Sequence, residues 1–388
     1  MHIALLGRQP ALSIAELERL YGSVLWFSDT AALIDTNQPI DIQRLGGSRK
    51  IGKIVLTLPL RDWRTTSMKL VQHYAKSFAE YDGKITLGIS TYGFDVSPRE
   101  IQKTGLILKN KLKNTNASLR LIPNQESALS TATAHHNKLG LSANKIELMV
   151  VRGNSNIVIA ESTGAQNITA LAARDQGRPR RDAFVGMLPP KLAQIMINLA
   201  GPLDGPTPRV LDPFCGTGVL LQEALLLGYN AYGTDLAEKM VRYSQDNLTW
   251  IKDKAHLTSE WTLAEGDAMT TSWQQPISAV VAETYLGQPF SAPPSSAKLT
   301  EVRGNCNHII SQFLKNLLPQ IEPGTPVVIG VPAWNDGTDH FTHLPLVESV
   351  EKLGYEQIPL RTARNEQLLY FRPEQVVGRE ILILRKPI

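Results

Sequence analysis

The chain has 388 residues, of which 43% are hydrophobic and 20% are charged, and its net charge is +4. This composition is typical of a folded protein with hydrophobic cores and excludes the collagen-like, disordered and disulfide-scaffold classes. The two cysteines, Cys215 and Cys306, are too few for a disulfide framework, so we expect a cytoplasmic protein. We expect neither a membrane span nor a signal peptide, because no run of eighteen apolar residues occurs and the first residues lack a basic segment.

Residues 1–80 are predicted to form a small α+β domain. An apolar strand over residues 2–7 precedes an amphipathic helix, which we expect Ser13 to cap with Glu16 in a capping box. Residues 23–35 have the pattern of paired strands. Residues 65–83 have the pattern of a helix that ends at a glycine.

Residues 81–165 are predicted to form a second α+β domain, which ends in a hairpin around residues 153–154. Its first helix begins at Ser97 and bears Lys109 and Lys113. Residues 101–190 hold 12 basic and five acidic residues. Such an excess favours contact with a polyanion, although a solvated basic face has the same composition.

Residues 166–190 are rich in glycine, proline and arginine and show no periodicity, so they are predicted to be a linker. Two interpretations of its arginines stay open. They bind phosphates as planar bidentate donors, or they form ion pairs with Asp175 and Asp182. The arginines concerned are Arg174, Arg178, Arg180 and Arg181.

Residues 191–388 alternate strand and helix patterns, which is typical of a doubly wound α/β domain closed by an antiparallel pair of strands. Within it, a strand ends at Asp212 and a turn containing Gly216 and Gly218 opens a helix. Glycines allow a ligand to approach the backbone closely. Asp235 and Asp267 end the next two strands, where carboxylates can bind ribose hydroxyls and an adenine edge. The alternative is a tight turn without a ligand.

The segment Asp-Pro-Phe-Cys-Gly-Thr-Gly, residues 212–218, resembles the cofactor loop of Rossmann-fold S-adenosylmethionine methyltransferases that modify RNA. Residues 171–200 resemble the linker and first helix of the tRNA guanosine-10 N2-methyltransferase family, and residues 6–17 its ferredoxin-like domain. Residues 88–93 and 129–132 are similar to its THUMP domain. The resemblance implies N-terminal ferredoxin-like and THUMP-like domains, the latter a tRNA-binding module, followed by a Rossmann-fold methyltransferase domain.

The same resemblance implies roles for individual residues. The methionine part of the cofactor would lie near Asp212, Phe214, Cys215, Gly216, Gly218, Met187, Leu188 and Pro189. The ribose would be held at Asp235 and Leu236, and the adenine at Asp267 and Ala268. Cys215 is expected to be a packing residue, because no histidine or base motif accompanies it.

One motif departs from the family. Amino-methyltransferases of this kind have D-P-P-Y or N-P-P-Y after the fourth strand, whereas this chain has Glu283-Thr-Tyr-Leu-Gly. Glu283 stands where the aspartate should be, and Tyr285 or Phe290 would supply the aromatic ring. A hydrogen-bond acceptor at the amino group is needed to assist attack and take the proton. The extra methylene of glutamate moves its carboxylate by about 1 Å, which can cost roughly a hundredfold in rate.

We therefore expect an S-adenosylmethionine-dependent tRNA methyltransferase, with Glu283 and Tyr285 as its catalytic residues and the exocyclic N2 of a guanosine as its target. The alternatives are a methyltransferase for another nucleobase, position or DNA, and a catalytically inactive tRNA-binding protein. We expect a monomer without a metal site, and the need for a small activator subunit stays open. The residues predicted to bind RNA are Arg174, Arg178, Arg180, Arg181, Lys109 and Lys113.

Overall fold

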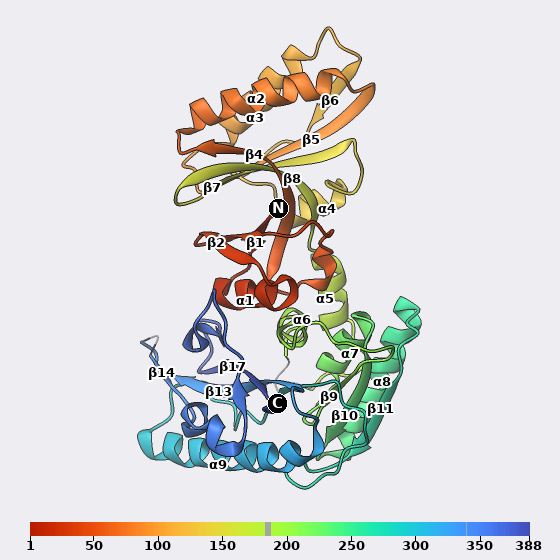
Figure 1. Cartoon of the computed structure of the whole chain (residues 1–388), viewed down its shortest axis with the longest axis vertical. Helices are drawn as coiled ribbons and strands as arrows, with labels where there is room; N and C mark the ends of the chain where they lie inside the picture. Colours follow the sequence, from red (N-terminus) through yellow and green to blue (C-terminus); the bar gives the residue numbers. More distant parts are fainter. Residues whose placement is uncertain (183–187, 339) are drawn as a thin grey trace. The chain divides into compact units, whose positions relative to one another are not determined.

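The computed structural model describes residues 1–182, 188–338 and 340–388 (Figure 1). The chain divides into two compact units. The N-terminal unit consists of residues 1–10 and 21–170, and the C-terminal unit consists of residues 11–20 and 171–388. The predicted domain boundaries at residues 80, 165 and 190 stay predictions.

The N-terminal unit is built on one sheet, which has eight strands among the described residues, in the order β2-β3-β1-β4-β8-β7-β5-β6. This sheet crosses the predicted boundary at residue 80, because β4 pairs antiparallel with β8. The predicted pair over residues 23–35 is confirmed as β2 and β3, and the predicted hairpin as β7 and β8. The strands are β1 (His2–Leu6), β2 (Val24–Ser28), β3 (Ala31–Ile34), β4 (Ser48–Pro59), β5 (Gly83–Tyr92), β6 (Ala117–Leu121), β7 (Lys145–Arg152) and β8 (Asn156–Ala165).

The helices of the N-terminal unit are α2 (Trp63–Ala79), α3 (Pro98–Lys111) and α4 (Thr131–His136), with the short η1 (Ile42–Arg44). Helices α2 and α3 share a core with the sheet, in which Leu70 and Tyr74 of α2 pack beside Ile85 and Ile101. Ser97 caps α3 in a capping box with Glu100, as the sequence predicts for its start.

Helix α1 (Pro10–Tyr21) is grouped with the C-terminal unit over residues 11–20. The prediction that Ser13 caps this helix is wrong: the helix begins at Pro10, whose fixed φ suits the first helical position, and Ser13 is buried within it. Glu16 likewise forms no capping box, since its Oε1 accepts a hydrogen bond of 2.8 Å from Asn198 Nδ2.

The segment predicted to be a linker contains helix α5 (Ile168–Gln176). Its apolar side buries Leu171, so a weak periodicity sufficed for a helix that also anchors Arg174. Residues 183–187 lie outside the described part of the chain.

The C-terminal unit contains the predicted doubly wound domain. Its sheet, nine-stranded within the described ranges, has the central order β11-β10-β9-β12-β13-β17-β15, with β14 paired to β13 and β16 to β17. Strands β11, β10, β9, β12 and β13 are parallel, and β17 is antiparallel to β13. The predicted antiparallel closing pair is confirmed, although β16 is short. The strand order reverses between β9 and β12, and in open α/β sheets ligands bind at such a switch point.

The elements of this unit have the following bounds. The strands are β9 (Arg209–Asp212), β10 (Asn230–Asp235), β11 (Trp261–Glu265), β12 (Ala279–Glu283), β13 (Pro326–Asn335), β14 (Phe341–Thr342), β15 (Glu356–Gln357), β16 (Leu369–Tyr370) and β17 (Val377–Arg385). The helices are α6 (Pro190–Leu199), α7 (Val219–Leu226), α8 (Glu238–Ala255), α9 (Ser296–Leu317), η2 (Leu318–Gln320), η3 (Pro345–Glu348), η4 (Val350–Leu353) and η5 (Asn365–Gln367).

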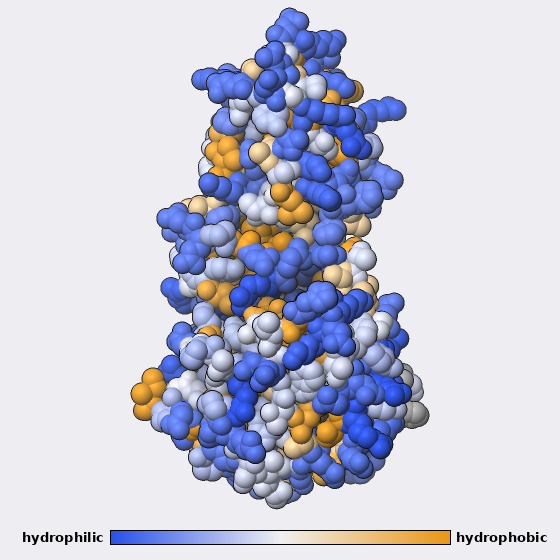
Figure 2. Space-filling model, turned by 90° about the vertical axis from the view of Figure 1, so that its right-hand side faces the viewer, coloured by the Kyte–Doolittle hydropathy of each residue, from blue (hydrophilic) through white to orange (hydrophobic). Residues whose placement is uncertain are grey.

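Helices cover both faces of this sheet (Figure 1). On one face α9 packs through Phe313 and Leu314 against Ile329 and Val331 of β13. Since side chains alternate along a strand, Gly330 between them faces the opposite side, where a Cβ would lie 3.5 Å from Met196 of α6. In Figure 2 the visible face is mostly hydrophilic, with small separate hydrophobic patches. None of the described helices is both long and apolar enough to cross a bilayer.

Candidate active site

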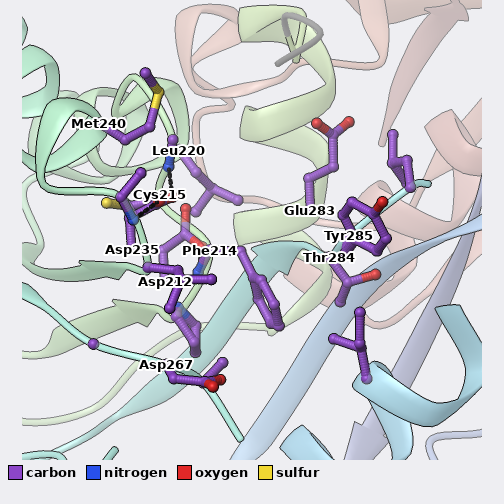
Figure 3. A pocket seen from close by; sticks show the side chains of 18 of the residues that line it. Asp212, Phe214, Cys215, Leu220, Asp235, Met240, Asp267, Glu283, Thr284 and Tyr285 are labelled. Carbon is purple, nitrogen blue, oxygen red and sulfur yellow. Dashed lines mark hydrogen bonds between the residues drawn. The ribbon is translucent and has the colours of Figure 1, made fainter. Parts of the chain in front are cut away.

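A pocket of about 620 Å³ opens at the carboxyl ends of β9, β10 and β12 (Figure 3). This volume lies within the range of roughly 300–1,000 Å³ that small-molecule sites occupy. It is lined by the loop after β9, the residues that follow β10 and β11, and residues 283–287 after β12. The pocket therefore joins the glycine-rich loop to the altered catalytic motif in one cavity.

The backbone of the loop after β9 requires its glycines. Gly216 and Gly218 have φ values of +51° and +79°, in the left-handed region that favours glycine. A Cβ on Gly218 would also lie 2.9 Å from Ser244 Oγ of α8. Helix α8 holds the loop in place, because Ser244 Oγ donates to the Gly216 carbonyl over 2.8 Å and Asn247 Nδ2 to the Thr217 carbonyl over 2.8 Å.

Asp212 and Asp235 lie on either side of this loop. Asp212, at the end of β9, is 2% exposed and accepts a hydrogen bond of 3.1 Å from the Phe214 amide. The two carboxylate oxygens of Asp235 accept hydrogen bonds of 2.9 Å from the amides of Gly216 and Ala237. Burial raises the pKa of Asp212 well above its usual value, and the neighbouring carboxylates of Asp235 and Glu283 raise it further.

The lining of the pocket is acidic. It contains four carboxylates and, among its described residues, no lysine, arginine or histidine. The carboxylates are Asp212, Asp235, Asp267 and Glu283. Such a lining favours a ligand that bears positive charge.

Glu283 is the last residue of β12, and its carboxylate forms an ion pair with Arg379 of β17. The Arg379 Nε to Glu283 Oε1 distance is 2.7 Å, and the two side chains are only 8% and 15% exposed. Tyr285, two residues after Glu283, is 40% exposed and lines the pocket, so its ring is available for stacking. Phe290, the second aromatic candidate, packs against the hydrophobic core instead.

Comparison with known proteins agrees with this geometry. Residues 178–305 match a protein-family model described as "RMKL-like, methyltransferase domain". The chain is 27% identical over 164 residues to a tRNA (guanine(10)-N2)-dimethyltransferase of Methanothermobacter thermautotrophicus, covering 42% of this chain and 44% of that protein. It is 33% identical over 117 residues to the enzyme of the same name from Pyrococcus abyssi, covering 29% of this chain and 30% of that one.

These matches confirm the resemblance to the tRNA guanosine-10 N2-methyltransferase family. They span less than half of the length of either relative. The fold is also similar to that of TrmN from Thermus thermophilus, with a TM-score of 0.53, 16% identity and 99% of both chains covered. At this identity the likeness concerns the fold alone, and it confirms the predicted Rossmann-fold methyltransferase domain.

The residues of the methyltransferase domain fit S-adenosylmethionine. This cofactor bears a sulfonium and an ammonium group, and both match the acidic lining. The left-handed Gly216 in the lining leaves its backbone without a side chain, and Leu236, 71% exposed, offers an apolar surface beside Asp235. Asp235 and Asp267 stand where a ribose and an adenine edge need acceptors.

The structure brings together nearly all residues predicted to hold the cofactor. The pocket is lined by Asp212, Phe214, Cys215, Gly216, Asp235, Leu236, Asp267, Ala268 and Leu188. Gly218 is not among the lining residues; it is the N-cap of α7 and contacts α8. Pro189 is the N-cap of α6, and Met187 lies outside the described residues. Their individual roles toward the cofactor stay predictions.

Cys215 is a packing residue, as expected. It is 5% exposed, and Ser244 Oγ donates to its sulfur over 3.7 Å. Burial raises the pKa of its thiol well above the usual value, and the neighbouring carboxylates of Asp212 and Asp235 raise it further. A thiol held in its neutral form is a poor nucleophile.

Two arginines predicted to bind RNA are engaged in the fold instead. Arg174 of α5 donates two hydrogen bonds, of 2.8 and 3.0 Å, to the carboxylate of Glu223, which is fully buried in α7. Arg178 is 4% exposed and donates to Thr217 Oγ1 over 3.2 Å. Composition alone could not separate these buried contacts from phosphate-binding groups.

The other predicted RNA-binding residues face solvent. Arg180 pairs with Asp246 over 2.6 Å with its side chain 52% exposed, and Arg181 is exposed. Lys109 and Lys113 are exposed at the end of α3 in the N-terminal unit. Asp182, suggested as an arginine partner, forms an ion pair of 2.7 Å with Lys239. These four basic residues stay candidates for RNA contact.

Proposed function

We propose that this chain is an S-adenosylmethionine-dependent tRNA methyltransferase that modifies the exocyclic N2 of a guanosine, at position 10 as in its named relatives. The observation that supports this most is the single acidic pocket that joins the cofactor loop to Glu283 and Tyr285. A pocket for the methyl donor thus opens directly onto an acceptor carboxylate and an aromatic ring.

S-adenosylmethionine would supply the methyl group from its sulfonium. Glu283 accepts a hydrogen bond from the target amino group at the carboxylate oxygen that does not pair with Arg379, and then takes its proton. This contact helps the nitrogen to leave conjugation with the ring. Tyr285 stacks on the flipped base and orients it for in-line attack. The chemistry requires mainly positioning, which the end of β12 provides.

Exposed basic residues support tRNA as the substrate. Lys109 and Lys113 end α3, and Arg180 and Arg181 follow α5. Lysines and arginines bind phosphate oxygens and fix the orientation of a nucleic acid without reading its sequence. We further propose that the protein acts as a monomer in the cytoplasm, where its two buried free thiols would stay reduced.

The test is methylation of unmodified tRNA transcripts by the purified chain with S-adenosylmethionine, followed by digestion and mass spectrometry of the nucleosides. We expect N2-methylguanosine or its dimethyl form, lost in Glu283→Gln and in transcripts with adenosine at position 10. Glu356→Gln, which disrupts a half-exposed ion pair with Arg385, is the matched control and should retain activity. A different methylated nucleoside, or no product from protein that binds tRNA and cofactor, contradicts the proposal.

A further inference from the structure

The carboxylate of Glu283 is fixed from a strand that lies two positions away in the sheet. Strand β12 pairs with β13, and β13 pairs with β17, so Arg379 must reach across β13 to bind Glu283. The Arg379 side chain is 8% exposed. Arg379 is not among the lining residues of the pocket, so it contacts Glu283 from behind.

The register of the three strands makes this reach possible. Glu283 stands opposite Gly330 of β13, and Gly330 stands opposite Ile381 of β17, two residues from Arg379. All three positions therefore point to the face covered by α6. A Cβ on Gly330 would lie 3.5 Å from Ile381 and 3.9 Å from Arg379 Cβ. The missing side chain leaves room for the guanidinium to cross the central strand.

The backbone beside Glu283 is fixed as well. Thr284 is 3% exposed, and both its amide and its Oγ1 donate to the Gly330 carbonyl, over 3.0 and 2.8 Å. The main chain after Glu283 is thus tied to β13, while the end of the side chain is tied to β17. Little freedom remains for the carboxylate.

We propose that Arg379 is a positioning residue that sets where the Glu283 carboxylate meets the amino group of the substrate. This inference rests on the proposed methyltransferase function. The longer glutamate side chain reaches Arg379, and the ion pair then defines the place of its second oxygen. A shorter aspartate at this position would lose Arg379, so glutamate and arginine form one unit.

The test compares Arg379→Met, Arg379→Lys and Glu283→Asp with the unmodified chain in the tRNA methylation assay. Since misplacement by about 1 Å can cost roughly a hundredfold, we expect kcat to fall by about this factor in Arg379→Met, with the KM for tRNA changed less than about threefold. Arg379→Lys should recover part of the loss because it keeps the positive charge. Glu283→Asp should also lower kcat, although it restores the residue type of the family motif.

A matched control lies on the same strand. Arg385 of β17 pairs with Glu356 over 2.9 Å at a half-exposed position, so Arg385→Met should keep normal kcat. Activity is expressed per cofactor-binding site measured by calorimetry, because a merely structural role would lower the folded fraction without lowering kcat per site. Arg379→Met should lower kcat no further in a Glu283→Gln background.

The outcomes separate the two proposals. Unchanged kcat per site in Arg379→Met, or higher kcat in Glu283→Asp, overturns the inference and leaves the proposed function standing. Absence of any methylated product from the unmodified chain overturns both. A large loss in Arg379→Met that lysine partly restores, with cofactor affinity retained, supports the positioning role.

Discussion

Asp235 offers the most direct test of the cofactor pocket. Its carboxylate follows β10 and accepts hydrogen bonds of 2.9 Å from the amides of Gly216 and Ala237. In the proposed complex it would also accept from the ribose hydroxyls. Asp235→Ala removes these acceptors and frees the loop at Gly216, so we expect weaker binding of S-adenosylmethionine.

The size of the effect follows from the charge of the acceptor. A hydrogen bond to a charged group contributes roughly 1.5–3 kcal/mol, so losing even one predicts a Kd that is about 10- to 150-fold higher. For the unmodified chain, ligand at about 100 times its Kd should add about 2.7 kcal/mol to the free energy of unfolding. For a unit of about this size, that corresponds to a Tm increase of roughly 5–11 °C. At the same ligand concentration the variant should gain only about 1–2 °C.

Calorimetry gives the Kd, and thermal unfolding with and without ligand gives the Tm increase. Asp246→Ala is the control, because Asp246 is 45% exposed and pairs with Arg180 on the surface of α8. Both measurements on the control should match those on the unmodified chain. A Kd for Asp235→Ala within about twofold of the original value would refute the assignment of Asp235 to the ribose.

Three further predictions concern charge elsewhere in the molecule. Burial raises the pKa of Asp212 above its unfolded value, so its contribution to stability is present at low pH and is lost as pH rises through the folded pKa. Asp212→Asn should therefore raise the Tm of the ligand-free protein at pH 8 relative to the unmodified chain and weaken cofactor binding; a lower Tm would contradict this. Arg174→Met leaves Glu223 buried without its partner and should cost about 3–5 kcal/mol of stability in denaturant unfolding, whereas a cost below about 1 kcal/mol would show that the pair is dispensable. Lys109→Gln combined with Arg181→Gln should weaken tRNA binding in a filter assay and reduce its salt dependence by about 0.7–0.9 per lost phosphate contact, with the Kd for cofactor unchanged; an unchanged salt dependence would place the RNA elsewhere.

The cofactor side of the pocket could be predicted because its determinants are local. The loop between Asp212 and Gly218 is contiguous, and Asp235 and Asp267 each come at the end of a strand that the hydrophobic pattern defines. Parallel strands bring their carboxyl ends to the same edge, so strand order alone places these side chains near one another. Glu283 was found in the same way, at the end of the fourth strand.

The surroundings of Glu283 could not be predicted, because they depend on contacts far apart in the chain. Arg379 is 96 residues away, and its position depends on the register of an antiparallel strand against β13. The arginines of residues 166–190 show the same limit. Nothing in the local sequence separates Arg174, which meets a buried carboxylate in α7, from Arg181, which is exposed. Burial is a property of the packed fold, so basic composition overestimated the RNA-binding surface.

The charges around the pocket explain why the departure from the family motif is compatible with catalysis. Asp212, Asp235 and Glu283 lie close enough that their charges raise the pKa of Asp212. A fourth group, Arg379, neutralises part of this charge without entering the pocket. The lining thus stays acidic toward a sulfonium, while Glu283 keeps one oxygen for the substrate and one for the guanidinium. A carboxylate that was merely longer would be free to collapse toward the bound cation. The ion pair prevents this, so Glu283 and Arg379 together perform the task that the family assigns to one shorter side chain.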